Sequence, residues 1–384
     1  MKIFFTRARD WYARYERPVS SASLIGGFVF DAVTLHRVDL FWENLWVLAH
    51  LVIVAVCIVL INRQENEAME SYDPSHAHFW YINVLQFFFG GLLSTYLVFY
   101  FRSATLSVAW PFLLLLAAAF IANESLKRHY ARLVFQISLF FLSLLAFSVY
   151  IVPVLFHRIG TDIFLLSGAA SLLVLWLFLR GLKFFVEPRQ FHNGAEPSEA
   201  LRRRAKERFS LSRKALMLSI AGIFLATHIL YFLNLIPPIP LSLKDGGIYH
   251  SLVRGAPGTY VVKSEETGWL DYFSLHETFH SSPGNTAAYA YSAIFSPASF
   301  DTDIVHEWQK YDSTAGKWIT ASRVALSVLG GREGGYRTYS YINNVAPGKW
   351  RVDVKTAGGQ VIGRLRFNVI RADTAPVLET IVKD

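Results

Sequence analysis

Six long apolar stretches occupy most of the first 240 residues of the chain. Each is about 20 residues long, which is the length that a helix needs to cross the hydrocarbon core of a bilayer, and each is too long and too uniform for a strand. The pattern predicts a membrane α-helical bundle with six transmembrane helices at minimum. The stretches are Leu40–Ile61, Tyr81–Phe101, Thr105–Ala122, Leu133–Phe156, Ile163–Phe185 and Ala215–Ile236.

A seventh apolar stretch, Ala22–Leu35, is shorter and carries Asp31. It could span the bilayer obliquely, re-enter it or lie at its interface. The connection Arg180–Lys214 holds ten basic residues against four acidic ones, so the positive-inside rule places it in the cytoplasm. The first 20 residues are also basic, and seven crossings leave both basic segments on the cytoplasmic side. The sequence therefore favours about seven transmembrane helices.

This topology divides the chain into three parts. Residues 1–20 form a basic cytoplasmic N-terminus, and residues 21–238 form a transmembrane helical domain with a cytoplasmic basic loop at 186–214. The run Pro237-Pro238-Ile239-Pro240 blocks continuation of the last helix. Residues 241–384 then form an external domain, which is periplasmic in a bacterium with two membranes.

The external domain shows short runs of alternating apolar and polar residues separated by Gly, Pro, Asn and Asp, a pattern that predicts antiparallel strands. Seven strands suit an all-β, two-layer sandwich, and we expect an immunoglobulin-like topology, although another small sandwich would have the same length and strand count. Trp308, Trp318 and Trp350 would fill its core. The predicted strands are Tyr260–Lys263, Ala287–Phe295, Ile304–Tyr311, Lys317–Val324, Tyr336–Ile342, Lys349–Lys355 and Val361–Val369.

The composition agrees with a membrane protein. Hydrophobic residues make up 53% of the 384 residues, charged residues 17%, and the mean hydropathy is +0.32. The first 238 residues hold 22 Lys and Arg against 15 Asp and Glu, and the rest hold 15 against 14. Because the basic residues lie between apolar stretches, we expect the lipid bilayer, and no nucleic acid, as a partner. Cys57 is the only cysteine, so no intrachain disulfide can form.

Three segments of the β-rich region carry a family resemblance: His306–Trp308, Gly330–Ser340 and Pro347–Val354. Together they resemble a bacterial domain of unknown function found at the C-termini of uncharacterised inner-membrane proteins, over roughly Ala287–Ile370. The helical half is similar to the multi-helix region that accompanies this domain, especially between Gly26 and Asp39. The resemblance implies this architecture and a periplasmic position for the domain, and it supplies no catalytic residue.

The run His276-Glu277-Thr278-Phe279-His280 matches the H-E-x-x-H string. If Trp269–His280 formed a helix, the two histidines would lie one turn apart and could bind zinc, while Glu277 activated water. The chain would then be a membrane-anchored zinc hydrolase. The β-rich surroundings and the lack of a third histidine at the metzincin distance argue against this alternative. We therefore expect no cofactor and no catalytic residue.

A second constellation contains histidine, tryptophan and arginine. Arginine forks can hold a carboxylate or phosphate, and aromatic faces can stack on a sugar or cation, so the set suits envelope glycans or anionic lipids. In the structural alternative the tryptophans fill the core and the arginines tie loops to backbone carbonyls. A binding patch requires both groups to point outward. The candidate ligand-binding residues are His306, Trp308, Arg332, Arg337 and Trp350.

Polar residues also interrupt the apolar stretches. Ionisable groups inside a membrane are costly, so Asp31 and His50 could belong to a proton or substrate path. That would indicate a transporter of an envelope lipid or glycan precursor, although the internal repeats typical of transporters are not evident. The alternative role is hydrogen bonding between helices. The residues concerned are Asp31, Asn44, His50, Gln86, Gln136 and His228.

Taken together, these patterns predict a non-enzymatic, multi-pass protein of the bacterial inner membrane. Its periplasmic β-sandwich would serve ligand binding or envelope assembly, with an envelope glycan, a lipid or a periplasmic protein as partner. The basic run Leu201–Arg208 would form a cytoplasmic surface helix attracted to anionic lipid, or a docking site for a cytoplasmic partner.

Overall fold

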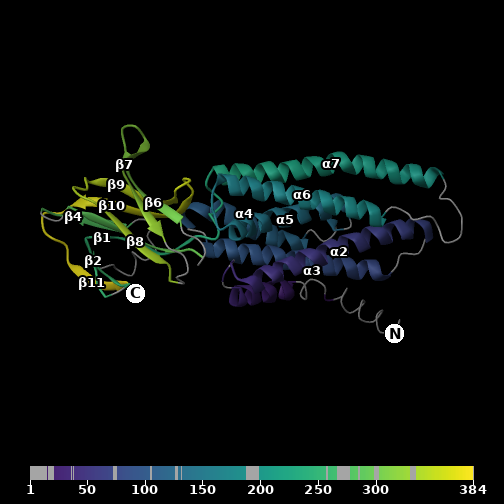
Figure 1. Ribbon diagram of the computed structural model, residues 1–384, viewed down its shortest axis with the longest axis horizontal. Coiled ribbons are helices and arrows are strands. Elements are labelled where there is room, and N and C mark those ends of the chain that lie inside the picture. The colour runs from purple at the N-terminus through teal and green to yellow at the C-terminus, as the bar shows by residue number, and fades with distance from the viewer. Residues whose placement is uncertain are drawn as a thin grey trace. The chain divides into compact units, whose positions relative to one another are not determined.

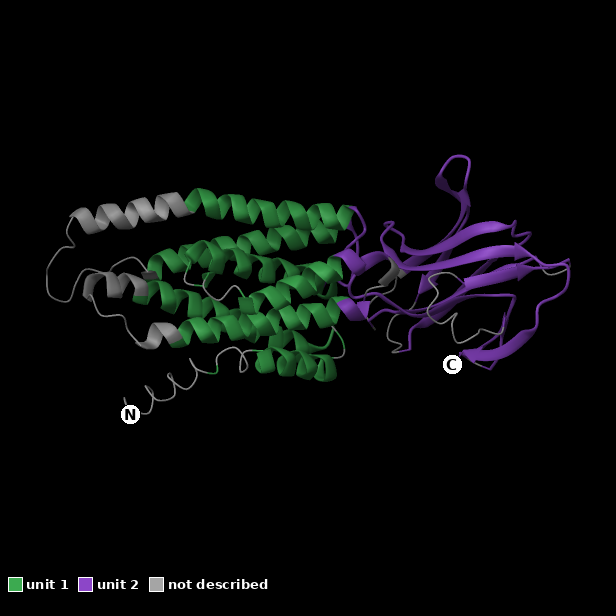
Figure 2. Ribbon diagram, turned by 180° about the vertical axis from the view of Figure 1, so that it is seen from behind, with its two compact units in different colours: residues 1–100, 112–155, 162–232 green, residues 101–111, 156–161, 233–384 purple. Residues whose placement is uncertain are grey.

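A computed structural model describes most of the chain and places helices before residue 233 and strands after it (Figure 1). Two compact units are present, and Figure 2 colours them separately. The second unit takes in residues 101–111 and 156–161 besides 233–384. The described residues are 15, 21–35, 37, 39–71, 76–103, 106–125, 129, 130, 132–186, 199–256, 258–265, 277–283, 286–297, 302–328 and 334–383.

The six long helices predicted from apolar length are confirmed. They run side by side in both views (Figures 1 and 2), and each is long and apolar enough to cross a membrane. Acidic residues in the first turn, Glu43 and Asp162, complement the helix dipole of two of them. The helices are α2 (Phe41–Ser71), α3 (His76–Ser103), α4 (Leu106–Ser125), α5 (Leu133–Phe156), α6 (Thr161–Val186) and α7 (Glu199–Phe232).

A left-handed residue follows the end of α5 by one position and the end of α7 by two. His157 has a φ of 52° and Asn234 a φ of 57°, which is the conformation that commonly ends an α-helix. Helix α5 is largely enclosed, because twelve of its residues, including Gln136 and Tyr150, are buried. Helix α7 differs strongly, since only 11% of its apolar span Arg213–Phe232 is buried.

The shorter apolar stretch is also a helix, Ser21–Thr34. The Ser21 hydroxyl donates to Glu124 Oε1 in the last turn of α4 at 2.8 Å, and the ring of Phe28 lies 5.7 Å from that of Phe120. Beyond the helix, the backbone N–H of Arg37 donates to the Glu43 carboxylate in the first turn of α2. This segment therefore extends from the C-terminal end of α4 to the N-terminal end of α2.

In the described residues of the second unit, eleven strands form three sheets. The largest sheet has the order β4-β10-β9-β6-β7, and the others are β1-β5-β8 and β11-β3-β2. Strand β4 pairs with β10 in parallel, while the other pairs are antiparallel. The strands are β1 (Ser242–Tyr249), β2 (Ser251–Arg254), β3 (Tyr260–Glu265), β4 (Glu277–Ser281), β5 (Ala288–Phe295), β6 (Thr302–Asp312), β7 (Lys317–Val328), β8 (Tyr336–Ile342), β9 (Gly348–Thr356), β10 (Val361–Arg371) and β11 (Leu378–Lys383).

The three sheets pack as three layers, with β1-β5-β8 in the middle. On one face of β5, Ala288 and Ala290 belong to the core formed with Trp308 and Trp350 of the five-stranded sheet. On the other face, Tyr291 packs in a cluster with residues of β2 and β3. Successive side chains of a strand point to opposite faces, so β5 is buried on both sides. Small residues face the tryptophans, and this leaves room for the indole rings.

Two expectations about this unit were wrong. The two-layer, seven-stranded sandwich is too small, because β1, β2, β4 and β11 were missed and the third sheet adds a layer. The arrangement therefore differs from the seven-stranded, two-sheet immunoglobulin topology. Trp318 is not a core residue either. It lies half-buried on the edge strand β7, where its indole ring is covered by Arg351 at 4.4 Å.

Candidate functional site

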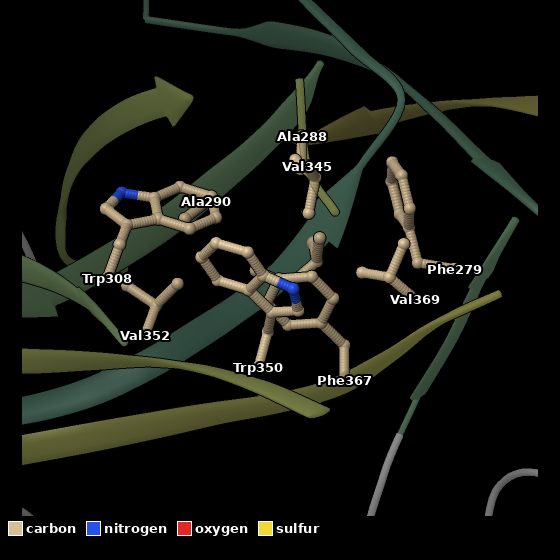
Figure 3. Close-up of a cluster of buried hydrophobic side chains, with 10 residues drawn as sticks. Phe279, Ala288, Ala290, Trp308, Val345, Trp350, Val352, Phe367 and Val369 are labelled. Carbon is tan, nitrogen blue, oxygen red and sulfur yellow. The ribbon is translucent and has the colours of Figure 1, made fainter. Parts of the chain in front are cut away.

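The aromatic and imidazole members of the predicted binding patch point into the sandwich core. His306 and Trp308 are fully buried, and Trp350 is 5% exposed. Figure 3 shows Trp308 and Trp350 packed with Phe367 among smaller apolar side chains. The physical reason is strand alternation, since the core faces of β6 and β9 carry every second residue. These three side chains are therefore not available to a ligand at the surface, and that part of the prediction was wrong.

His306 is held in the core by hydroxyl groups. Its Nε2 lies 2.8 Å from Ser292 Oγ, and its Nδ1 lies 2.9 Å from Ser340 Oγ. Ser340 Oγ also accepts a hydrogen bond from Trp308 Nε1 at 2.9 Å, and Ser292 bonds to Thr338. Burial lowers the pKa of His306 to about 4. A neutral imidazole with both nitrogens paired is suited to joining strands, not to proton transfer with a substrate.

Arg337, in β8, is bonded to the connection between β2 and β3 and to the first residue of β3. Its guanidinium donates to the carbonyl oxygen of Gly258, and its own carbonyl oxygen accepts from the Tyr260 hydroxyl at 3.4 Å. This matches the structural alternative, in which an arginine binds backbone carbonyls. Arg332, the other arginine of the predicted patch, lies outside the described residues.

The H-E-x-x-H string does not form a helix in its described part. Glu277–Ser281 is strand β4, paired in parallel with β10. In a strand, Glu277 and His280 point to opposite faces, whereas the zinc motif needs helical spacing. The helix that the zinc alternative requires over Trp269–His280 is therefore absent over Glu277–His280, and His276 lies outside the described residues. In the described part of the chain, no group of three or more His, Cys, Asp or Glu side chains is placed to hold a metal ion.

Instead, Glu265 bridges two histidines. Its Oε1 lies 2.7 Å from His250 Nε2 and accepts the His280 backbone N–H at 2.6 Å, while its Oε2 lies 2.6 Å from His280 Nδ1. Burial opposes ionisation of Glu265, but these hydrogen bonds outweigh it and lower its pKa to about 2. The bridge joins β3 of one sheet to β4 of another, and the ring of His250 stacks on Phe279 at 4.0 Å.

The outward face of the five-stranded sheet carries a charged cluster that the sequence reasoning missed. Its two acids are buried under basic side chains, since Glu307 is 3% exposed and Asp353 is 1% exposed. Glu307 accepts from Arg323 at 2.7 Å and from Lys355, and these bonds outweigh burial to lower its pKa to about 2. Asp353 accepts from Arg364 Nε at 2.5 Å and from its Nη2 at 2.9 Å.

Arginines from β9 and β10 enlarge this cluster. Arg351 donates through Nε to Gln309 at 2.6 Å and is the residue whose guanidinium covers Trp318. In the β9–β10 ladder Arg351 lies directly opposite Arg366. Burial lowers the pKa of Arg351, and although Asp353 opposes this, the charges of Arg364 and Arg366 lower it further. We give the name cationic face to a group of outward side chains from β6, β7, β9 and β10, namely Glu307, Gln309, Trp318, Thr320, Arg323, Arg351, Asp353, Lys355, Arg364 and Arg366.

The signal for the cationic face is present in the sequence as alternation. Arg351, Asp353 and Lys355 alternate with buried residues of β9, and Arg364 and Arg366 do so in β10. The sequence does not show the register of β9 and β10, which decides which of these side chains lie opposite one another.

The two intramembrane candidates, Asp31 and His50, both lie against α3 in the bundle. Asp31 is 5% exposed and faces the hydroxyls of Ser94 and Thr95 on α3. His50 is 7% exposed, its Nδ1 lies 2.9 Å from the carbonyl oxygen of Trp46, and its ring packs against Phe88. Both therefore contact groups of the bundle itself, as in the helix-packing alternative.

A chain of buried amide side chains links four helices and was only partly anticipated. Asn62 Nδ2 donates to Gln136 Oε1 at 2.8 Å, and Gln136 Nε2 donates to the Tyr130 carbonyl oxygen at 2.6 Å. The Tyr130 hydroxyl donates to Asn123, which exchanges hydrogen bonds with Gln86 through their backbone oxygens at 3.3 and 3.4 Å. Such bonds satisfy polar groups that would be costly in an apolar bundle.

Comparison with known proteins identifies a domain but no activity. Residues 301–369 match the family described as a protein of unknown function (DUF2914), so the chain carries this domain in its C-terminal part. This agrees with the resemblance seen in the sequence. The matched segment contains β6, β7, β8 and β9 and nearly all of β10, and therefore most of the cationic face. No curated protein sequence matches the chain.

Two solved structures show weak similarity. One is a β-glucosidase from Listeria innocua in complex with isofagomine, with 10% identity and a TM-score of 0.21; the match covers 30% of this chain and 16% of that one. The other is the alkylpurine DNA glycosylase AlkC from Pseudomonas fluorescens bound to DNA containing an abasic site analogue, with 12% identity, a TM-score of 0.22, and coverage of 85% and 99%. Neither similarity is strong enough to carry an argument about fold or function.

Proposed function

We propose that this chain is an integral protein of a bacterial inner membrane and that it presents the β-rich unit in the periplasm for ligand binding or envelope assembly, without catalysis. The observation that carries the membrane assignment is helix α7. Its span Arg213–Phe232 has a mean hydropathy of 2.0, yet only 11% of it is buried. Leu218 is 75% exposed and Leu225 is 59% exposed. A helix this apolar exposes a large patch that water disfavours and lipid accommodates.

The orientation rests on the charges of the same helix. The basic run Leu201–Arg208 lies in the N-terminal part of α7, and the C-terminal end leads into the β-rich unit. The positive-inside rule favours the basic end in the cytoplasm. The strands that follow α7 then lie on the opposite, periplasmic side.

The segment from Ser21 to Glu43 supports a seventh crossing. Its contacts run from the C-terminal end of α4 at Glu124, past Phe120, to the N-terminal end of α2. A helix of this length rises only about 20 Å, but the residues after Thr34 extend its reach to the other end of the bundle. Seven crossings leave the basic N-terminus and the basic part of α7 on the same side.

Labelling of single cysteines tests this topology. Cys57 is buried in α2, so a Cys57→Ser chain provides an unlabelled background. We expect a membrane-impermeant maleimide to label Thr314→Cys, in the turn between β6 and β7, in intact spheroplasts. Ser198→Cys, in the basic connection, should be labelled only after lysis. The reverse pattern, or recovery of the chain in the soluble fraction, would contradict the proposal.

A further inference from the structure

A buried carboxylate in the helical unit has only hydroxyl groups as polar neighbours. Asp31 is 5% exposed, and the groups that face its carboxylate are the hydroxyls of Ser94 and Thr95 on α3. A carboxylate that is removed from water is costly unless a positive charge compensates it. Asp31 therefore requires either a bound proton or a bound cation.

The basic side chains closest to Asp31 in the sequence have other partners. Arg37 forms an ion pair with Asp39 at 2.5 Å. His50 contacts a different turn of α3, and its Nδ1 lies 2.9 Å from the carbonyl oxygen of Trp46. In the part of the chain that the structure describes, no basic side chain contributes to the electrostatic surroundings of Asp31.

The position of Asp31 in its helix adds to this demand for positive charge. The residue lies in the last turn of the helix Ser21–Thr34. The C-terminal end of a helix carries a partial negative charge, which disfavours an acidic side chain there and favours a cation. The carboxylate and the helix end therefore attract the same kind of ligand.

The Ser94 hydroxyl is a second, independent sign of a ligand. Ser94 is 1% exposed and lies next to the Asp31 carboxylate, yet its Oγ makes no hydrogen bond of ordinary geometry to the described residues. Other hydroxyls of the bundle behave differently, since Ser167 and Thr227 each donate to the carbonyl oxygen four residues earlier. The lone pairs of the Ser94 oxygen are thus available beside a carboxylate.

We propose that Asp31, Ser94 and Thr95 form a binding site for a sodium ion between the helix Ser21–Thr34 and α3. Hard cations are bound by oxygen atoms of this kind. One carboxylate neutralises a monovalent cation, whereas a divalent cation would leave an unpaired charge in an apolar bundle. Ser94 and Thr95 are only 1% and 2% exposed, and such close packing favours sodium over the larger potassium ion. Sodium binding would be an activity of the helical unit, beyond the presentation of the β-rich unit.

The test uses the full chain in a detergent with a neutral headgroup. Binding of radioactive sodium is measured by scintillation proximity in choline chloride at constant ionic strength. We expect saturable binding that unlabelled sodium displaces at least about tenfold better than potassium does. Absence of saturable binding, or equal displacement by potassium, would overturn the inference.

Three variants locate the ion. Asp31→Asn keeps the shape of the side chain and removes its charge, so it should abolish saturable binding, and Ser94→Ala should weaken binding about fivefold or more. Asp162→Asn makes the same charge change at an exposed position in the first turn of α6 and should alter affinity less than about twofold. Sodium binding retained by Asp31→Asn, or lost equally in Asp162→Asn, would refute the assigned site.

Thermal stability separates an ion site from a structural role. Sodium should raise the apparent Tm of the native chain by at least about 3 °C and leave that of Asp31→Asn unchanged. In sodium-free choline chloride, Ser94→Ala should have the native Tm, because its oxygen has no hydrogen bond to lose, and Asp31→Asn should have the native Tm or a higher one. A lower Tm of Asp31→Asn without sodium would indicate a structural carboxylate instead. A native Tm that responds to pH but not to sodium would show that Asp31 holds a proton, and either result would overturn the inference.

Discussion

His306 Nδ1 and Ser340 Oγ lie 2.9 Å apart in the core between two sheets, because β6 belongs to the five-stranded sheet and β8 to the middle one. The same oxygen accepts the Trp308 indole N–H. One hydroxyl therefore satisfies two buried polar groups and fixes the positions of the two sheets relative to each other.

Replacing Ser340 with alanine should destabilise the β-rich unit by about 2–4 kcal/mol. The substitution leaves a buried indole N–H and an imidazole nitrogen without their partner, and each such loss costs about 1–3 kcal/mol. Hydrogen exchange measured by mass spectrometry should show faster exchange in peptides of β6 and β8. The matched control is Ser327→Ala, which removes an exposed hydroxyl bonded to Asp303 and should change exchange little. Equal effects of the two variants would refute this role of Ser340.

His306 should make the unit less stable in acid. Its pKa is lowered to about 4 in the folded chain, against about 6.5 when unfolded. The neutral ring favours folding, so its contribution is complete above about pH 6.5 and is lost as the pH falls toward 4, by about 3 kcal/mol in total. Thermal unfolding followed by near-UV circular dichroism between pH 7 and pH 4 measures this change. In His306→Gln the same pH range should have a much smaller effect, and an unchanged slope would be inconsistent with this cause.

Glu265 should make the stability of the β-rich unit depend on pH in a lower range than His306 does. Its pKa is lowered to about 2 in the folded chain, so its stabilising contribution is present above its ordinary pKa near 4.5 and is lost as the pH falls toward 2. At pH 7, Glu265→Gln removes a charged acceptor from both His250 and His280, and we expect a loss of about 1–3 kcal/mol. Faster hydrogen exchange in β3 and β4 of Glu265→Gln would measure this loss of stability. Glu379→Gln, at an exposed position of β11, is the control and should leave exchange in these strands unaltered.

These interactions explain which parts of the structure the sequence could predict. Helix α5 was predicted to its end residues, because an apolar run of membrane length is a local signal. The alternation of Lys349–Lys355 likewise gave β9. Strand β1 was missed because its Gly246-Gly247 pair is typical of a turn, whereas in the structure Gly246 allows close approach of Leu365, 3.1 Å from the place of a Cβ atom.

The binding residues were harder to predict because their roles depend on partners far along the chain. The sequence shows that His306 and Trp308 share one face of a strand, but only the pairing of sheets shows that this face is the core. In the same way, Arg351 and Arg366 are separated by a hairpin, and their direct opposition follows from the register of β9 and β10. Local patterns therefore predicted the elements, and long-range register decided the site.

The amide chain of the bundle should contribute to its stability. Gln136→Leu removes the hydrogen bonds that Gln136 makes to the Asn62 amide and to the Tyr130 carbonyl oxygen, and polar contacts in membrane helices are worth about 0.6–2 kcal/mol. We expect a lower apparent Tm of the detergent-solubilised chain. Asn62→Leu should lower the apparent Tm less in the Gln136→Leu chain than in the native chain, because its partner Gln136 is already absent there. Additive losses in this double-mutant cycle would show that the two amides act independently.

Gly335 should tolerate substitution by alanine less well than Gly316, although both glycines have a left-handed backbone conformation. Its φ is 85°, and a Cβ atom there would lie 2.8 Å from both the Ala293 carbonyl carbon and the Ile294 nitrogen. Backbone atoms of the buried strand β5 cannot shift as a flexible side chain can. Gly316, in the turn between β6 and β7, has a φ of 63°, and a Cβ atom there would meet nothing within 4 Å.

Alanine at Gly316 should therefore cost only the conformational strain of about 1 kcal/mol. Alanine at Gly335 adds overlap with β5 and should cost at least about 2 kcal/mol more, a typical cost of overpacking. Apparent Tm values of the two variants, measured side by side, give the difference. Near-equal values would mean that β5 and the start of β8 separate easily. The close packing of the middle sheet, on which the position of His306 depends, would then not hold in solution.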